Sequence, residues 1–136
     1  MDAKEVSQLD AYLKKLFGTP RIRVVPKAND MAEVFIGEED LGELTSDDEE
    51  GELSYNFRME IDLGTQAEVL PVHLTSCLRR KFDNENIRVV ARPKKNDSLE
   101  VYIGEEFIAV LFVENERGRK IFILELPILD VDLVGV

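Results

Sequence analysis

One heptapeptide occurs twice in this sequence, as EVFIGEE at residues 33–39 and as EVYIGEE at residues 100–106. The two copies differ only by the exchange of Phe35 for Tyr102. Aromatic and β-branched residues followed by Gly and two acids are typical of a strand that enters a turn. The doubled stretch therefore predicts that one structural unit occurs twice in the chain.

The sequence before each heptapeptide repeats as well. RIRVV at 21–25 and IRVVA at 87–91 each predict a strand. Turns at residues 29–30 and 96–97 join these strands to the heptapeptides, since Asn and Asp tolerate left-handed backbone angles. Still further upstream, the apolar positions of a predicted helix correspond with a constant offset of 65 residues: Leu9, Leu13 and Phe17 match Leu74, Leu78 and Phe82.

The repeat predicts an α+β fold built from two tandem helix-plus-antiparallel-β-meander units. We expect an α-β-β-β-β repeat over 1–63 and another over 64–136. A single unit of this size buries a low fraction of its surface, whereas two units share a core. The two are therefore predicted to pack as a pseudo-twofold pair in one compact body.

Local signals place the elements of the first repeat. Asp2 followed by Glu5 has the spacing of a capping box, and Gly18 ends the helix predicted at 2–17. The predicted strands of this repeat are 21–26, 32–37, 40–45 and 52–62.

The helix of the second repeat has two possible beginnings. Thr65 and Glu68 have the spacing of another capping box, but Pro71 would then interrupt the helix. The sequence therefore predicts a helix that is either kinked or begins near Pro71.

Composition narrows the classes of partner. The chain of 136 residues is 44% hydrophobic, as ordinary globular domains are. Its net charge of −11 argues against nucleic acid or an anionic membrane as partner, because both require surplus Lys and Arg. A single cysteine, no secretory pattern at residues 1–5 and no apolar run of about 20 residues predict a cytoplasmic protein.

Two strands of the second repeat are unusually apolar. FIAVLFV at 107–113 and IFILEL at 121–126 contrast with the alternating LGELT at 41–45. Such strands are typically buried on both faces, so we expect the other repeat or another chain to cover the face that the helix leaves open, with a homodimer favoured over a monomer. The predicted interface consists of Phe107, Ile108, Val110, Phe112, Ile121, Phe122, Ile123 and Leu124.

His73 and Cys77 are the only histidine and cysteine, and they lie four residues apart on the second predicted helix. This spacing permits a thiolate activated by imidazole. A structural zinc site would require four ligands, and no further His or Cys exists. The favoured interpretation is a buried thiol beside a surface imidazole.

Acidic residues offer two further candidate sites. The pairs at 38–39 and 105–106 recur at equivalent turns, which favours a role in the turn over acid–base catalysis. The acidic loop at 46–52 fails as a calcium loop, because aligning Gly51 with the sixth position puts Phe57 where a bidentate Glu is required. No catalytic, cofactor-binding or metal-binding residues are predicted.

A basic patch is predicted in the second repeat. The missing stacking aromatics and the overall charge favour pairing with acids or a protein partner over nucleic-acid binding. Its members are Arg79, Arg80, Lys81, Arg88, Arg92, Lys94 and Lys95.

The stretches IRVVARPKKNDS at 87–98, EVYIGEEFI at 100–108 and ILDVDL at 128–133 carry a resemblance. With these motifs the chain resembles a family of alphaproteobacterial proteins, about seventy residues long, classed as a domain of unknown function. The first copy is similar in its helix and in GELSYNF at 51–57, and departs at VPKA, 25–28. The resemblance implies a bacterial, cytoplasmic origin and a tandem duplicate of that domain.

The sequence thus predicts a non-enzymatic protein-interaction module without cofactors, acting as a homodimer with a protein partner. One alternative is a small acidic protein similar to a secretion chaperone, which binds an extended client. Another is a thiol-based redox sensor or enzyme that uses Cys77.

Overall fold

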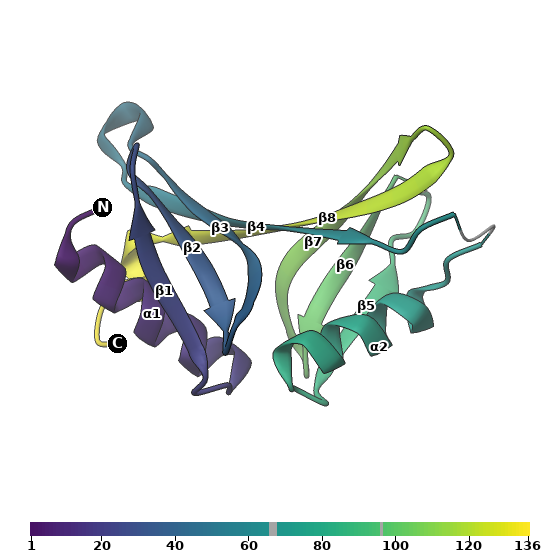
Figure 1. Ribbon diagram of the computed structural model, residues 1–136, viewed down its shortest axis with the longest axis horizontal. Coiled ribbons are helices and arrows are strands. Elements are labelled where there is room, and N and C mark those ends of the chain that lie inside the picture. Colours follow the sequence, from purple (N-terminus) through teal and green to yellow (C-terminus); the bar gives the residue numbers. More distant parts are fainter. Residues whose placement is uncertain (66–67, 96) are drawn as a thin grey trace. The chain divides into compact units, whose positions relative to one another are not determined.

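The computed structural model describes residues 1–65, 68–95 and 97–136 and confirms the predicted α+β class. The first repeat forms α1 (Ala3–Phe17), β1 (Ile22–Lys27), β2 (Met31–Ile36), β3 (Glu39–Asp47), the short 3-10 helix η1 (Glu49–Gly51) and β4 (Ser54–Asp62). The second forms α2 (Pro71–Phe82), β5 (Ile87–Ala91), β6 (Ser98–Ile103), β7 (Glu106–Glu116), β8 (Arg119–Leu129) and the 3-10 helix η2 (Asp130–Leu133). Each helix is followed by antiparallel strands (Figure 1).

The two helices begin differently. The Asp2 carboxylate accepts a hydrogen bond from the Glu5 N–H, and Glu5 accepts one from the Asp2 N–H, so the predicted capping box is confirmed. Helix α2 begins at Pro71, the second of the two predicted starts. There the Nδ1 atom of His73 accepts a hydrogen bond of 3.0 Å from the Leu70 N–H. Residues 66 and 67, between the predicted capping residues Thr65 and Glu68, lie outside the described part of the chain.

The repeated heptapeptides form the same hairpin in both copies. Ile36 pairs with Glu39 and Ile103 with Glu106, which leaves two-residue loops. The first loop residue is Gly37 or Gly104, with φ of 58° and 60°, as a type II′ turn requires. Both copies also carry a register shift in the same strand pair, between residues 34 and 35 and between 101 and 102. The paired acids at 38–39 and 105–106 therefore serve the turn and the first position of the next strand.

The turns predicted at 29–30 and 96–97 lie before the heptapeptides, and the structure describes the first of them completely. Asn29 and Asp30 both have positive φ, so the predicted turn between β1 and β2 is confirmed. In the second copy, Asn96 lies outside the described residues, and Lys94 is the residue with positive φ. Strands β7 and β8 are joined by a tight turn through Arg117 and Gly118, both left-handed.

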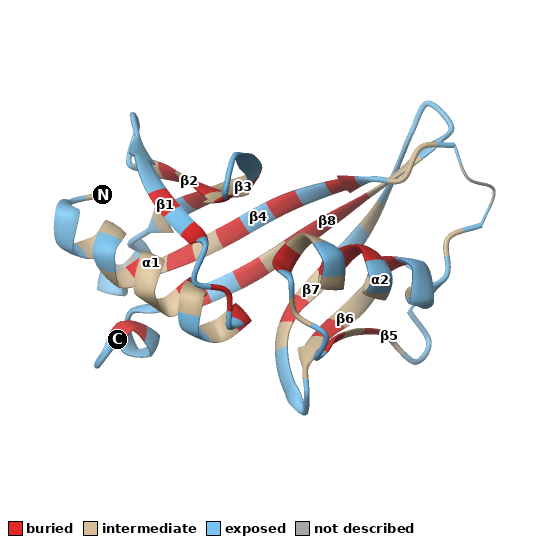
Figure 2. Ribbon diagram, turned by 60° about the horizontal axis from the view of Figure 1, so that its bottom comes forward, coloured by how far each residue is buried: buried red, intermediate tan, exposed pale blue. Residues whose placement is uncertain are grey.

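Apolar side chains on one face of each set of strands pack with a helix. Buried and exposed residues alternate along β4 (Figure 2), as the period of a half-buried strand requires. The first helix and its strands bury Leu9, Leu13, Phe17, Ile22, Val24, Ala32, Val34, Leu44, Tyr55 and Phe57. The second helix and its strands bury Leu74, Leu78, Phe82, Ile87, Val89, Val101, Ala109, Leu111, Phe122 and Leu124.

The compact units do not coincide with the repeats. One unit consists of Met1–Arg58 together with Pro127–Val136, and the other of Met59–Leu126. The chain therefore leaves the first unit in the middle of β4 and returns to it near the end of β8. The division predicted at 63/64 follows the repeat in sequence, whereas each compact unit contains the closing segment of the other repeat. How the two units pack stays a prediction.

Each closing segment is part of the core of the unit that receives it. In the first unit, Ile128 is fully buried and Leu133 is 3% exposed, and η2 lies against α1. In the second unit, Met59 and Ile61 are buried, and both Asp62 carboxylate oxygens accept hydrogen bonds of 3.0 Å from Arg119. Both units are thus completed by residues from the other copy.

Candidate interaction surfaces

The outward face of the second unit's sheet carries an apolar strip, defined here as Val110, Phe112 and Ile121. In the register of the sheet, Phe112 lies between Ser98 on β6 and Ile123 on β8. Phe112 is 43% exposed, and Val110 and Ile121 are half-buried. Ala109 and Leu111, which alternate with the strip residues, point into the core and are buried.

In the single chain, the stretch 107–113 is buried on one face and exposed on the other, and its cover by a partner stays a prediction. Phe107 is 51% exposed and Ile108 is half-buried, because a helix covers only one face of these strands. Strand β8 differs, since Phe122, Ile123 and Leu124 are all at most 3% exposed. Phe122 and Leu124 alternate with Ile123, which is paired with Phe112 on the outward face; all three predicted interface residues are buried in the single chain, which leaves the β7 residues and Ile121 exposed or half-buried.

The matching face of the first unit is polar. The residues equivalent to Val110 and Phe112 are Glu43 and Thr45, with an offset of 67. Lys27 lies 3.4 Å from a Glu33 carboxylate oxygen and 3.5 Å from one of Glu43. The two copies thus share the strand register here and differ in the chemistry of one face.

Asp40 lies beside this charged group. Asp40 is exposed, but desolvation, and then the neighbouring Glu33 carboxylate, raise its pKa above the ordinary value of 3.8. The outward face of the first unit therefore contains two carboxylates that interact unfavourably when both are ionised.

One arginine of the predicted basic patch has a structural role that both copies share. The Arg88 guanidinium lies 4.6 Å from the ring centre of Tyr102, and its Nε donates to the Gly104 carbonyl. In the first copy, Arg23 lies over Phe35 at 4.8 Å and donates to the Gly37 carbonyl. These arginines clamp the two-residue turns that the heptapeptides form.

The remaining basic residues form two groups at opposite ends of β5. Arg79, in the last turn of α2 with Arg80 and Lys81, donates a hydrogen bond of 2.7 Å to the Ile87 carbonyl at the beginning of β5. Arg92 follows the end of β5 and donates to Ser98 Oγ, with Lys94 and Lys95 beyond it. The predicted single patch is therefore divided, with five residues of β5 between its parts.

His73 and Cys77 lie on α2 as predicted, with Cys77 4% exposed and His73 exposed. The Nδ1 atom of His73 is engaged by the Leu70 N–H at the beginning of the helix. The thiol is thus buried, and one of the two imidazole nitrogens is used at the beginning of the helix.

The outer edge of β1 has its donors paired. The Val24 N–H donates to Asp10 Oδ2 at 3.0 Å and the Ile22 N–H to the Thr19 carbonyl at 3.2 Å. The next residue that faces outward by strand alternation is Pro26, which has no N–H. Strand β5 has a related cap, because the Val89 N–H donates to Thr75 Oγ1 at 2.9 Å. The edges are thus poor templates for an added strand.

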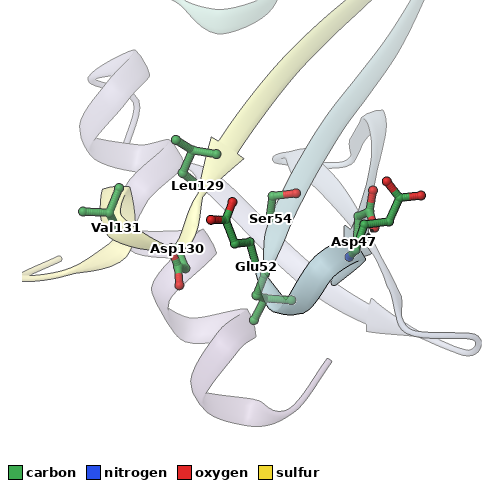
Figure 3. Close-up of a pocket in the computed structure, with 8 residues that line it drawn as sticks. Asp47, Glu52, Ser54, Leu129, Asp130 and Val131 are labelled. Carbon is green, nitrogen blue, oxygen red and sulfur yellow. Dashed lines mark hydrogen bonds between the residues drawn. The ribbon is translucent and has the colours of Figure 1, made fainter.

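An open hollow of about 650 Å³ lies in the first unit (Figure 3). We call it the acidic hollow; it is lined by Asp47, Glu49, Glu52, Leu53, Ser54, Leu129, Asp130 and Val131. Its walls come from η1 and the beginning of β4 in the first repeat, and from the end of β8 and η2 in the second. Among the described side chains, no three Asp, Glu, His or Cys groups gather in a way that would hold a metal ion.

Sequence reasoning did not predict this hollow as a site. The acidic loop at 46–52 is rejected there as a calcium loop, and 128–133 is assigned to the other repeat. A signal was present in ILDVDL, where Leu129 and Val131 alternate with Asp130 and remain 53% and 64% exposed. The sequence alone contains no sign that this segment packs in the first unit.

A family model described as "Protein of unknown function (DUF3126)" matches the chain twice, at residues 5–63 and 72–132. The chain belongs to this DUF3126 family. The resemblance to a duplicated domain of unknown function is thereby confirmed. Comparisons with curated proteins and with solved structures found no match.

The two DUF3126 matches end in the segments that the copies exchange. The first match ends at residue 63, just after the part of β4 that belongs to the second unit, and the second ends at 132, within η2 of the first unit. One DUF3126 copy therefore contains a helix and strands for one unit and a closing segment for the other. Of the described helices, none has both the length and the apolar character that crossing a membrane requires.

Proposed function

We propose that this DUF3126 protein is a non-enzymatic protein-interaction module that forms a homodimer through the apolar strip. The observation that carries the proposal is the exposure of Phe112 beside Val110 and Ile121, on a face where the first copy is polar. Exposed apolar groups gathered on one sheet face mark interaction surfaces. With −11 charges on the chain, nucleic acid and anionic membranes are poor candidates as partners.

Charges beside the strip support a second copy as its occupant. Arg92 reaches the β6 side of the strip, where it donates to Ser98, and Glu125 lies on the β8 side, paired with Val110. A twofold axis parallel to the strands would place the β6 side of one copy over the β8 side of the other. Opposite charges would then meet at both margins, as an isologous interface requires.

The alternatives have less support. A secretion-chaperone-like protein that adds an extended client as a further strand requires a free edge, and the Val24 and Ile22 donors of β1 are already paired. A redox role needs an accessible thiol, and Cys77 is 4% exposed. We place the module in the cytoplasm, because a single cysteine is the pattern of a reducing compartment.

Sedimentation velocity across a concentration series tests the dimer. The double variant Val110→Glu/Phe112→Thr brings the strip close to the pattern of the first copy, which has Glu43 and Thr45 at these places. We expect a wild-type dimer and a folded, monomeric variant. Thr45→Glu in the first unit is the matched control and should leave the dimer intact. A monomeric wild-type chain, or a variant as dimeric as wild type, would refute the proposal.

A further inference from the structure

The acidic hollow combines exposed apolar side chains with carboxylates. Leu129 and Val131 are 53% and 64% exposed, and Leu53 beside them is half-buried. Figure 3 shows Glu52 and Asp130 on different walls of the hollow, with Leu129 and Val131 close by. A ligand that fits here must offer apolar surface and positive charge together.

The charge of the hollow has one sign. Four of its eight described lining residues are acidic, namely Asp47, Glu49, Glu52 and Asp130, and none is basic. The first repeat around it also carries a net charge of −9, against −2 for residues 64–136. Such a field attracts cationic partners and repels phosphate backbones and anionic lipids.

The hollow is specific to the first unit. Asp47 and Ser54 pair across a six-residue connection that contains η1. At the equivalent place in the second unit, Glu116 and Arg119 pair across a two-residue turn, which leaves no such wall. The longer connection is the part of the first copy that builds the acidic side of the hollow.

We propose that the acidic hollow binds a short segment of a partner protein in which Lys or Arg residues alternate with apolar residues. The apolar side chains contact Leu53, Leu129 and Val131, while the basic groups pair with Glu52, Asp130 and their acidic neighbours. The proposal goes beyond the proposed dimer, since strip and hollow lie in different units. Because the ion pairs are exposed to water, binding weakens as salt is added.

The test uses the full chain, labelled with ¹⁵N, and three synthetic peptides that alternate Lys with Leu, Lys with Ser, or Glu with Leu. We expect the Lys–Leu peptide to shift the amide signals of Leu53, Leu129 and Val131. The Lys–Ser peptide should bind at least about tenfold more weakly, because it lacks apolar contacts, and the Glu–Leu peptide should not bind.

Variants separate the hollow from general attraction to an acidic protein. The double variant Glu52→Gln/Asp130→Asn should bind the Lys–Leu peptide at least about tenfold more weakly than wild type. Val131→Ser should also weaken binding of this peptide. Glu38→Gln/Glu105→Gln removes the same charge from the hairpin turns and should leave the affinity within about twofold. The strip variant Val110→Glu/Phe112→Thr should bind as wild type does, which separates this test from that of the dimer.

Three outcomes would overturn the proposal. The first is that the Lys–Leu peptide shifts signals elsewhere, or binds the hollow variants as tightly as wild type. The second is equal binding of the Lys–Ser peptide, which would reveal charge attraction alone. The third is that calcium chloride shifts Leu53, Leu129 and Val131 when the peptide does not, which would assign the hollow to a cation.

Discussion

Asp10 on α1 accepts a hydrogen bond of 3.0 Å from the backbone N–H of Val24 on β1. In the second copy, Thr75 on α2 accepts the corresponding bond, 2.9 Å long, from Val89 on β5. Both pairs have the same spacing of fourteen residues, although one acceptor is a carboxylate and the other a hydroxyl. The position thus preserves an acceptor for an edge-strand N–H, which ties each helix to its sheet and blocks that donor.

Removing the acceptor in the second copy should weaken the unit and expose its edge. Thr75→Val keeps the shape of the side chain and leaves the Val89 N–H without its partner. We expect a loss of about 0.5–1.5 kcal/mol in the free energy of unfolding, with faster aggregation on heating. Urea denaturation and light scattering measure the two effects. Thr75→Ser retains the hydroxyl and serves as the control. Equal stability of the Thr75→Val and wild-type chains would contradict the role of Thr75 as acceptor.

The exchange of closing segments predicts that the first unit depends on the end of the second repeat. Ile128 is fully buried there, so Ile128→Ala should cost about 2–4 kcal/mol. Amide hydrogen exchange should accelerate in α1 and β1–β3, while α2 and β5–β7 change little. The exposed Val134→Ala is the matched control and should be close to neutral.

A truncated chain gives the stricter form of this prediction. A chain that ends at Leu126 retains every residue of the second unit and lacks ten residues of the first. It should keep protected amides in α2 and β5–β7 and lose protection in α1. Equal loss of protection in both helices would show that the units do not fold separately.

Much of the fold follows from local sequence. The capping residues Asp2 and Glu5, the helix-breaking Gly18 and the doubled heptapeptide act within a few residues, so their structures were predictable. The exchange of closing segments was not, because Ile61 and Ile128 have the same alternating pattern whichever helix they pack against. The acidic hollow depends on that exchange, which explains why its apolar side was missed.

The side chain of Tyr55 connects the beginning of α1 to β4. Its hydroxyl donates a hydrogen bond of 2.5 Å to Glu5 Oε2, while Glu5 Oε1 accepts from the Asp2 N–H. Burial, and then the hydrogen bond to Glu5, raise the pKa of Tyr55 above its usual value. The tyrosine therefore stays neutral and acts as a donor at physiological pH.

Tyr55→Phe removes this donor without removing the ring. We expect a loss of about 1–2 kcal/mol in the free energy of unfolding, since the acceptor is a carboxylate. Thermal or urea unfolding gives the value. Tyr102→Phe is the control in the second unit, because the Tyr102 hydroxyl makes a longer contact of 3.3 Å to Glu100. A control variant that loses more stability than Tyr55→Phe would contradict the assignment.

The raised pKa of Asp40 predicts that folding stability depends on pH with the opposite sign to that of a carboxylate in a favourable ion pair. Desolvation and the Glu33 carboxylate raise its pKa in the folded protein above 3.8, so ionising it disfavours the fold. This penalty is present above the raised pKa and absent below 3.8. Asp40→Asn removes the charge and keeps an acceptor for the Gly42 N–H. The variant should therefore have a higher Tm than wild type at pH 7.

That gain should shrink as the pH falls and should vanish below about 4, where wild-type Asp40 is itself protonated. Scanning calorimetry of both chains between pH 3.5 and about pH 7 follows the difference. Glu38→Gln changes the net charge by the same unit at an exposed turn and controls for general charge repulsion. If Asp40→Asn gained no more than Glu38→Gln at neutral pH, the raised pKa of Asp40 would have no measurable effect on folding.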